Sequence, residues 1–349
     1  MKTMAAAFAL CAVAAAAAPS DTWQASMDAA RQAETHGDAN TARKGFQEAL
    51  DWARAHRDSR ASLSAFELAA LDEHQDRTAE AERVLKTETD GAPPTVEMAP
   101  LLTLLARAES REGKLADSEA TERRIVEAWR SAHLPDETVV ARSLSDLART
   151  LLEERKYADA AAAWREAVGI LDKTLGPEAP ATVLYRARIF WTEARLGQFH
   201  DADTGYRELL LAMRNGDSSV RRQVAAEYAG VLHDRNRDEE ASAVLNEANR
   251  DGPGPPRVGP GITPPKLLSR REPEFSAEAR NAKLQGAVVV QAEIDEAGQV
   301  GRLAVIEPLG MGLDAKAVEA LRTWKFSPAT RDGKPLAVSI VVEIHFGLL

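Results

Sequence analysis

Apolar residues recur at helical spacing from Trp23 to Arg250, and short stretches rich in Gly, Asp or Pro interrupt them at regular intervals. Apolar positions three and four apart form one face of a helix, whereas a half-buried strand alternates every second residue. Almost no alternation occurs in this region. The pattern therefore predicts a series of amphipathic helices joined by short turns.

The helical pattern repeats along the chain. Ala160 and Ala202 occupy equivalent positions 42 residues apart, and a step of the same size back from Ala160 reaches Ser118. A small residue at this position lets two helices of a hairpin approach closely, and a larger residue four positions later fills the space beside it. The same offsets recur around Ala42, and weaker copies of the pattern surround Ala81 and Ala241. We therefore expect about six helical hairpins over residues 23–250.

This pattern resembles the tetratricopeptide repeat (TPR) family, and its 42-residue spacing, with LGPEAPAT at residues 175–182, resembles the kinesin-light-chain form of the repeat. The resemblance implies an all-α TPR-like superhelix with a groove that binds a peptide or protein. Arg31, Arg107 and Arg149 fall at one equivalent position, and Trp191 takes that position in the fifth unit. A column of arginines suits carboxylates. The alternative is a solvated helix face that uses Arg as a good helix former.

A linker and a second domain follow the predicted array. Residues 251–265 read DGPGPPRVGPGITPP, in which ten of fifteen residues are Pro or Gly. Such a segment forms neither a helix nor a central strand, so it predicts a semi-extended tether and a domain boundary. Residues 266–349 then alternate between apolar and polar at 288–294, 300–306 and 338–346, with a helical stripe from Leu313 to Trp324 that we expect Pro328 to end. This order predicts a small α+β domain with a three-stranded antiparallel sheet.

The tail resembles the C-terminal domain of TonB-family proteins. The resemblance extends over nearly all of residues 266–349 and includes the stretches LDAKAVEAL and WKFSPA; one departure is Phe275-Ser276, where the family has Tyr-Pro. The signature positions in this chain are Gly286, Leu313, Asp314, Trp324, Phe326 and Pro328.

The TonB resemblance implies that the domain binds partners by strand addition at a sheet edge, typically to a segment of an outer-membrane receptor. The last predicted strand is the candidate edge. Its residues are Val338, Ser339, Ile340, Val341, Val342, Glu343, Ile344, His345 and Phe346. The alternative is a core strand with no binding role.

The first residues have the features of an export signal. Lys2 precedes an unbroken apolar run from Met4 to Ala17, and Ala15 and Ala17 fit the small-residue cleavage rule, so we expect residues 1–17 to be removed. The alternative is an uncleaved inner-membrane anchor. Cys11 is the only cysteine and lies in this segment, so the mature chain would have no disulfide and no Cys-bound metal.

Composition and motifs restrict the function further. The net charge of −10 argues against a nucleic-acid surface. The acidic excess belongs to the array, because residues 266–349 contain eleven acidic and eleven basic side chains. No phosphate loop, nucleophile elbow or zinc-protease helix is present in the sequence. We therefore expect no enzymatic activity, no cofactor and no metal.

Together these features predict a periplasmic, non-catalytic adaptor whose tail domain binds other envelope proteins and whose array binds a further peptide or protein. One alternative is a TonB-type energy transducer anchored in the inner membrane. Another is a cell-envelope assembly factor built on the TPR array. A homodimer through the tail domain also remains open.

Overall fold

A computed structural model describes residues 19–250, 252 and 254–347 of the protein. The predicted signal peptide, residues 1–17, lies outside the described residues. The chain divides into two compact units, Met1–Asp90 and Gly91–Leu349. Within the described ranges, no helix combines the length and apolar character needed to cross a membrane.

The first unit contains two helix pairs, α1 (Pro19–Thr35) with α2 (Ala39–Ala55) and α3 (Ala61–His74) with α4 (Thr78–Thr89). Asp38 ends the turn before α2, where its carboxylate accepts the backbone N–H of Thr41 at 3.1 Å. This contact satisfies one of the N–H groups that every helix leaves free at its start. Large side chains such as Phe46 and Leu68 are fully buried between the helices.

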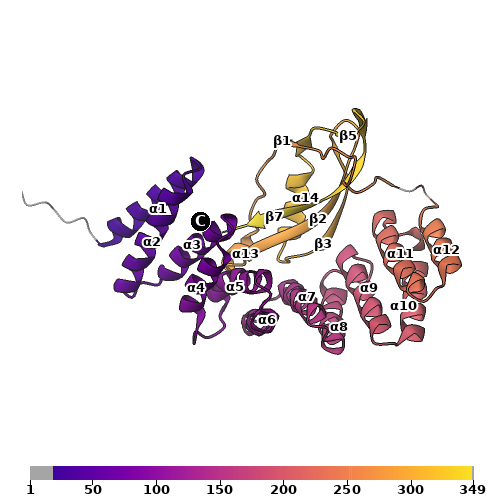
Figure 1. The fold of residues 1–349 in the computed structure, drawn as a ribbon, viewed down its shortest axis with the longest axis horizontal. Coiled ribbons are helices and arrows are strands. Elements are labelled where there is room, and N and C mark those ends of the chain that lie inside the picture. Colours follow the sequence, from indigo (N-terminus) through magenta and orange to yellow (C-terminus); the bar gives the residue numbers. More distant parts are fainter. Residues whose placement is uncertain (1–18, 251, 253, 348–349) are drawn as a thin grey trace, which may run out of the picture. The chain divides into compact units, whose positions relative to one another are not determined.

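The second unit begins with four further helix pairs (Figure 1). They are α5 (Ala99–Arg111) with α6 (Leu115–Ser131), α7 (Thr138–Glu153) with α8 (Tyr157–Thr174), α9 (Pro180–Arg195) with α10 (Phe199–Ala212), and α11 (Ser218–His233) with α12 (Asp238–Ala248). Short 3₁₀ turns, Val96–Met98 and Met213–Asn215, precede α5 and follow α10. The prediction of about six hairpins is confirmed for the described residues.

The repeat has the physical basis that the sequence indicates. Each second helix carries a small residue at the equivalent position, and these residues are at most 7% exposed: Ala42, Ala81, Ser118, Ala160, Ala202 and Ala241. The larger residues four positions later are buried in four of these pairs, Phe46, Leu85, Trp164 and Tyr206, whereas Glu122 is partly buried and Leu245 is 36% exposed. A larger side chain at this position would push the two helices apart, so the size of the residue here sets the distance between them.

The tail is a small α+β domain, as expected. Its sheet has the order β3-β2-β7, with β2 (Gly286–Ile294) paired antiparallel to both β3 (Val300–Glu307) and β7 (Val338–Phe346). Two short helices, α13 (Ala277–Asn281) and α14 (Leu313–Leu321), accompany it. Two small two-stranded ladders were not predicted: β1 (Leu267–Ser269) with β4 (Lys325–Phe326), and β5 (Ala329–Arg331) with β6 (Lys334–Leu336).

Helix α14 covers one face of the sheet. The residues of β2 that point toward it, Val288, Val290, Ala292 and Ile294, are fully buried. The predicted end of this helix was wrong, because α14 stops at Leu321 and Pro328 lies after β4. Trp324 instead lies in the turn after the helix, where its indole Nε1 donates to the carbonyl of Arg271 at 2.9 Å. Its ring still joins the core and is 8% exposed.

Candidate partner-binding surfaces

One candidate surface is the outer edge of β7. The backbone N–H of Ser339 donates to the carbonyl of Pro256 at 2.8 Å, so it points away from β2. The register between β2 and β7 runs without a break from Gly286–Phe346 to Ile294–Val338. Because N–H groups on a strand point to opposite sides at successive residues, those of Val341, Glu343 and His345 point outward too. Within the described part of the chain these three groups donate to no backbone carbonyl outside the sheet, and they form the open donor row of the edge.

The side chains along this edge divide as the alternation predicts. Val338, Ile344 and Phe346 are buried on the α14 side, and Ile340 and Val342 are partly buried there. On the other side Val341 is 57% exposed, and the side chains of Glu343 and His345 are 61% and 68% exposed. Ser339 is the exception, because it is buried where its hydroxyl accepts the side-chain amide of Gln291 at 2.9 Å.

The segment predicted as a tether runs along the tail domain. Arg257 forms a parallel bridge with Ser339, so this segment covers the first part of the β7 edge. Thr263 and Thr330 exchange backbone hydrogen bonds of 2.8 and 3.1 Å, and the backbone N–H of Ser327 donates to the carbonyl of Lys266 at 2.7 Å. The β7 edge is therefore open only from Val341 onward.

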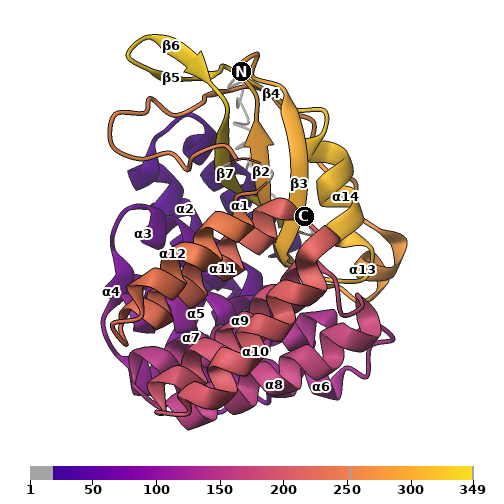
Figure 2. The same ribbon diagram turned by 90° about the vertical axis from the view of Figure 1, so that its right-hand side faces the viewer.

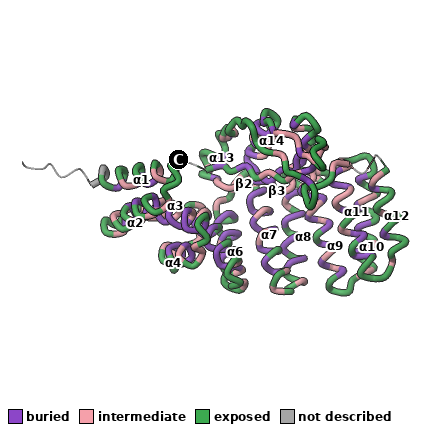
Figure 3. Tube along the Cα trace, turned by 45° about the horizontal axis from the view of Figure 1, so that its top comes forward, coloured by how far each residue is buried: buried purple, intermediate pink, exposed green. Residues whose placement is uncertain are grey.

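A second candidate surface is the face of the array formed by the first helices of its pairs. Strand β3 lies against α9, and the views in Figures 1 and 2 place the sheet beside α7, α9 and α11. Ala304 of β3 is 4% exposed and packs in one cluster with Val183 and Ala187 of α9. The face of β2 that points away from α14 is covered as well, since Val289 and Gln291 are 6% and 7% exposed. Figure 3 marks the buried residues of α7 and of other elements in purple. The sequence pattern gave no sign of this second cover.

Charged groups hold the two parts of the unit together. Arg142 of α7 lies 2.7 Å from a carboxylate oxygen of Glu307 at the end of β3 and donates to the carbonyl of Ala287 at 3.3 Å. Arg149, about two helical turns further along α7, lies 3.1 Å from the other carboxylate oxygen of Glu307. Asp146 contacts both arginines. Burial lowers the pKa of Arg142, but the carboxylates of Asp146 and Glu307 outweigh it and raise the pKa overall. This arrangement is a two-arginine clamp on one carboxylate.

The loop before α14 meets the array at close range. The backbone N–H of Met311 donates to the carboxylate of Asp136, which lies just before α7. Gly310 has φ +90°, and a Cβ there would lie 2.8 Å from Cβ of Thr138. Both the backbone conformation and the available space therefore require glycine at this position.

Two further ion pairs join α11 to the sheet. Arg222 lies 3.7 Å from Glu293 of β2, and Arg302 of β3 lies 3.5 Å from Asp217. Asp217 also accepts the backbone N–H groups of Ser219 and Val220 at the start of α11. These pairs are partly exposed and individually weak, so they set register more than affinity.

The predicted arginine column has different surroundings at each position. Arg31 pairs with Glu67 at 2.7 Å within the first unit. Arg107 is exposed on α5. Arg149 contacts Glu307 of the tail, and Trp191 is partly exposed beneath the guanidinium of Arg195, 4.6 Å from the ring centre. Of the four, Arg149 thus contacts a carboxylate from another part of the fold.

The signature residues of the tail have structural roles. The carboxylate of Asp314 accepts the backbone N–H groups of Leu309 and Gly310 at 2.7 and 3.0 Å, which shapes the loop that meets the array. Burial raises the pKa of Asp314, although these two bonds act in the opposite direction. Leu313 is fully buried and Phe326 is 7% exposed. Gly286 has φ +153° and lies against Leu309.

The departure from the family pattern at Phe275-Ser276 is accommodated locally. The ring of Phe275 packs edge-to-face on Phe346, with ring centres 5.6 Å apart. The hydroxyl of Ser276 accepts the backbone N–H of Ala279 at 3.1 Å and donates to the carbonyl of Met311 at 2.6 Å. Ser276 therefore starts α13 as an N-cap.

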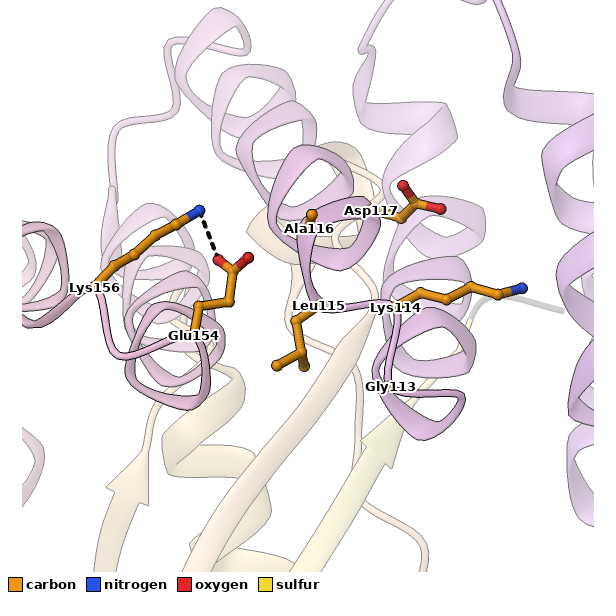
Figure 4. A pocket seen from close by; sticks show the side chains of 7 residues that line it. All are labelled: Gly113, Lys114, Leu115, Ala116, Asp117, Glu154 and Lys156. Atoms are coloured by element: carbon orange, nitrogen blue, oxygen red, sulfur yellow. Dashed lines mark ion pairs between the residues drawn. The ribbon is translucent and has the colours of Figure 1, made fainter.

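An open depression also lies between the turn before α6 and the turn after α7 (Figure 4). Residues 113–117, Glu154 and Lys156 line it, and Lys156 pairs with Glu154 at 3.0 Å. Lys156 also contacts Glu119 at 2.5 Å. Glu154 and Lys156 pair on one side of the depression, and its open, charged lining has the features of a solvated surface between repeats.

Part of the tail is similar to a known protein family. Residues 271–348 match the family described as Gram-negative bacterial TonB protein C-terminal. Protein TonB of Vibrio cholerae is 33% identical over 89 residues, which are 25% of this chain and 36% of that protein, and protein TonB of Salmonella typhimurium is 28% identical over 85 residues, 24% of this chain and 34% of that protein. The chain thus spans about a third of the length of these relatives.

Solved structures resemble the helical part. A tetratricopeptide repeat protein from Parabacteroides merdae aligns over 67% of this chain and 82% of its own, with 11% identity and a TM-score of 0.48. TPR-like repeats of a kinesin-light-chain type from Podosopora anserina align over 56% of this chain and 96% of their own, with 17% identity and a TM-score of 0.43. The chain thus combines an array of helix pairs with a C-terminal segment, residues 271–348, that is similar to TonB C-terminal domains.

Proposed function

We propose that this protein is a periplasmic, non-catalytic adaptor that binds an envelope protein by strand addition to the β7 edge. The observation that carries this proposal is the outward row of N–H groups at Val341, Glu343 and His345, in a domain that matches the TonB C-terminal family. An extended segment paired here would become the fourth strand of the sheet. Main-chain hydrogen bonds would supply most of its affinity.

The N-terminal segment of an outer-membrane receptor is the partner class that the TonB-like domain favours, which would link the protein to receptor-dependent transport. Residues 256 and 257 already occupy the edge at Ser339. The partner strand would therefore pair with residues 341–346 only. This length corresponds to three outward N–H groups, which fits a short segment of about six residues.

Proline substitutions at the edge test this function. Because the N–H groups of Val341 and His345 point away from β2, Val341→Pro and His345→Pro remove outward donors and spare the ladder inside the sheet. We expect both variants to stay folded by circular dichroism and to lose binding to receptor segments in a fluorescence titration. Glu343→Gln is the matched control, because it changes a side chain on the same edge and keeps the main chain.

Retention of wild-type affinity in a folded proline variant would exclude the β7 edge. Ile344→Pro provides an internal check on the geometry, since its N–H points toward β2 and its replacement should destabilise the sheet. A homodimer formed by two β7 edges is the competing use of the same donors. Light scattering during chromatography would show it as a doubled mass that the same proline variants abolish.

The energy-transducer alternative differs in the fate of the N-terminus. A cleaved signal gives a mature chain that begins at Ala18, whereas a transducer keeps Met1 and its apolar segment in the inner membrane. Mass spectrometry of the protein from fractionated cells separates the two. The assembly-factor alternative rests on the array alone, and deletion of residues 266–349 would then leave the cellular phenotype unchanged.

A further inference from the structure

Helices α7, α9 and α11, the first helices of their pairs, pack against the TonB-like domain of the same chain. On the array side, α7, α9 and α11 contribute Arg142, Arg149 and a small apolar patch that includes Ala187. On the tail side, β3 contributes Ala304 and Glu307. Because the helix face that the TPR resemblance assigns to a peptide is the face that β3 contacts, the two cannot be occupied together.

We propose that the face of α7, α9 and α11 is a built seat for the chain's own C-terminal domain, and that this intramolecular complex closes the array groove and the β3 edge. The consequence for binding is direct. One sheet edge, β7, remains for a partner strand, and a peptide that competes for α7, α9 and α11 binds only when the tail leaves.

The first reason is the chemistry of the clamp. Glu307 receives both arginines on separate oxygens, at 2.7 and 3.1 Å, and its side chain is 25% exposed. Arg142 has a side-chain exposure of 18% and donates in addition to a backbone carbonyl of β2. A partly buried carboxylate with two guanidinium partners forms a directional contact, in contrast to isolated ion pairs on a solvated surface.

The second reason is independent of charge. Gly310 approaches the array so closely that a Cβ would meet Thr138 at 2.8 Å and a carboxylate oxygen of Asp136 at 2.9 Å. Apolar contacts accompany this approach, because Ile306 packs against the cluster around α9. The loop before α14 can approach the array this closely only in one shape. Asp314 maintains that shape by accepting the backbone N–H groups of Leu309 and Gly310.

The array offers a matched pair of positions for the test. Arg149→Glu places a negative charge opposite Glu307, whereas Arg107→Glu makes the same change at the equivalent repeat position on α5. Both residues are exposed, so the two variants differ in the contact of Arg149 with Glu307. The tail offers a second pair. Glu307→Lys places a positive charge opposite the two arginines, and Glu296→Lys makes the same change in the turn between β2 and β3, where the residue is exposed.

Hydrogen–deuterium exchange of the full-length chain measures the seat directly. We expect Arg149→Glu and Glu307→Lys to raise exchange in both β3 and α9 by at least about tenfold, with an increased radius of gyration in X-ray scattering. The two control variants should match the wild type. Unchanged exchange at β2 and β7 shows that the tail remains folded.

Two results would overturn the proposal. One is wild-type exchange of β3 and α9 in both clamp variants. The other is a wild-type radius of gyration that already matches the clamp variants, because the tail would then be detached in solution. If Glu307→Lys unfolds the tail, Arg149→Glu still decides, since Arg149 belongs to the array. Binding at the β7 edge is measured separately and fails or survives independently of this result.

Discussion

Truncation of Trp324 to alanine tests how the tail domain is stabilised. The ring is 8% exposed and lies 6.4 Å from the ring of Phe326, so Trp324→Ala removes a large buried surface at the end of α14. Such truncations cost about 3–5 kcal/mol. The lost hydrogen bond to Arg271 adds little, because Arg271 is exposed and water can replace the indole N–H at its carbonyl.

Hydrogen exchange under native conditions is the appropriate assay, because a chain with two compact units need not unfold in one step. The slowest amides of β2 report opening of the tail itself. A loss of about 3–5 kcal/mol corresponds to an acceleration of roughly 10²–10³-fold or more at 1.4 kcal/mol per factor of ten. Trp324→Phe is the control, since it keeps a ring and removes only the N–H donor.

A change in opening free energy below about 1 kcal/mol for Trp324→Ala would refute this packing, because a buried indole cannot be lost at so small a cost. Equal effects of Trp324→Ala and Trp324→Phe would also contradict it. That outcome would assign the contribution to the hydrogen bond with Arg271 and not to the buried ring.

Two further predictions concern pH and the linker. Burial, followed by the charge of Asp146, raises the pKa of Glu122 on α6 to about 8, so the folded state holds a proton that the unfolded chain releases near pH 4.5. The stabilising contribution of this proton is complete below about pH 4.5 and is lost as the pH rises to about 8, at a slope of up to about 1.4 kcal/mol per pH unit. Glu122→Gln should therefore melt at a higher temperature than the wild type at pH 9 and at the same temperature at pH 4.5, whereas the exposed Glu127→Gln should follow the wild type throughout. The same dependence of melting temperature on pH in Glu122→Gln and the wild type would contradict the assignment. Limited trypsin digestion should cut first after Arg250, where the Pro/Gly linker begins, or after Arg257 within it, and leave two resistant fragments that co-elute through the seat described above. Fragments that elute separately, or early cleavage within α5–α12, would count against this expectation.

The sequence predicted most of the local structure because local structure follows local patterns. The small residues at Ala160 and Ala202 indicated the helix pairs, and the alternation from Val288 to Ile294 indicated the central strand. The end of α14 was predicted too late, since Trp324 continues the apolar stripe although the backbone has already turned. A stripe reports burial, and a residue in a turn can be buried as well as one in a helix.

The contact between array and tail could not be predicted in this way. Glu307 lies 158 residues after Arg149, and no pattern in the sequence connects them. Arg31, Arg107 and Arg149 are equivalent in the repeat, and only the folded chain distinguishes the one that meets the tail. Because Gln291 is polar, the sequence indicated that the face of β2 opposite α14 is exposed to solvent. In the structure Gln291 is buried. Such contacts depend on tertiary placement, which a periodic pattern does not contain.

The central claim is that a partner adds a strand to β7, and amide exchange followed by NMR during a peptide titration tests it most directly. The probes are synthetic peptides that copy the N-terminal segments of outer-membrane receptors from the same organism, at concentrations up to about 1 mM, where binding free energies near 4 kcal/mol remain detectable. We predict that the amides of Val341, Glu343 and His345 become protected together, while that of Ser339, already bonded to Pro256, does not change. Protection of β3 in place of β7, or no protection at any of the three amides with any peptide, would contradict the account.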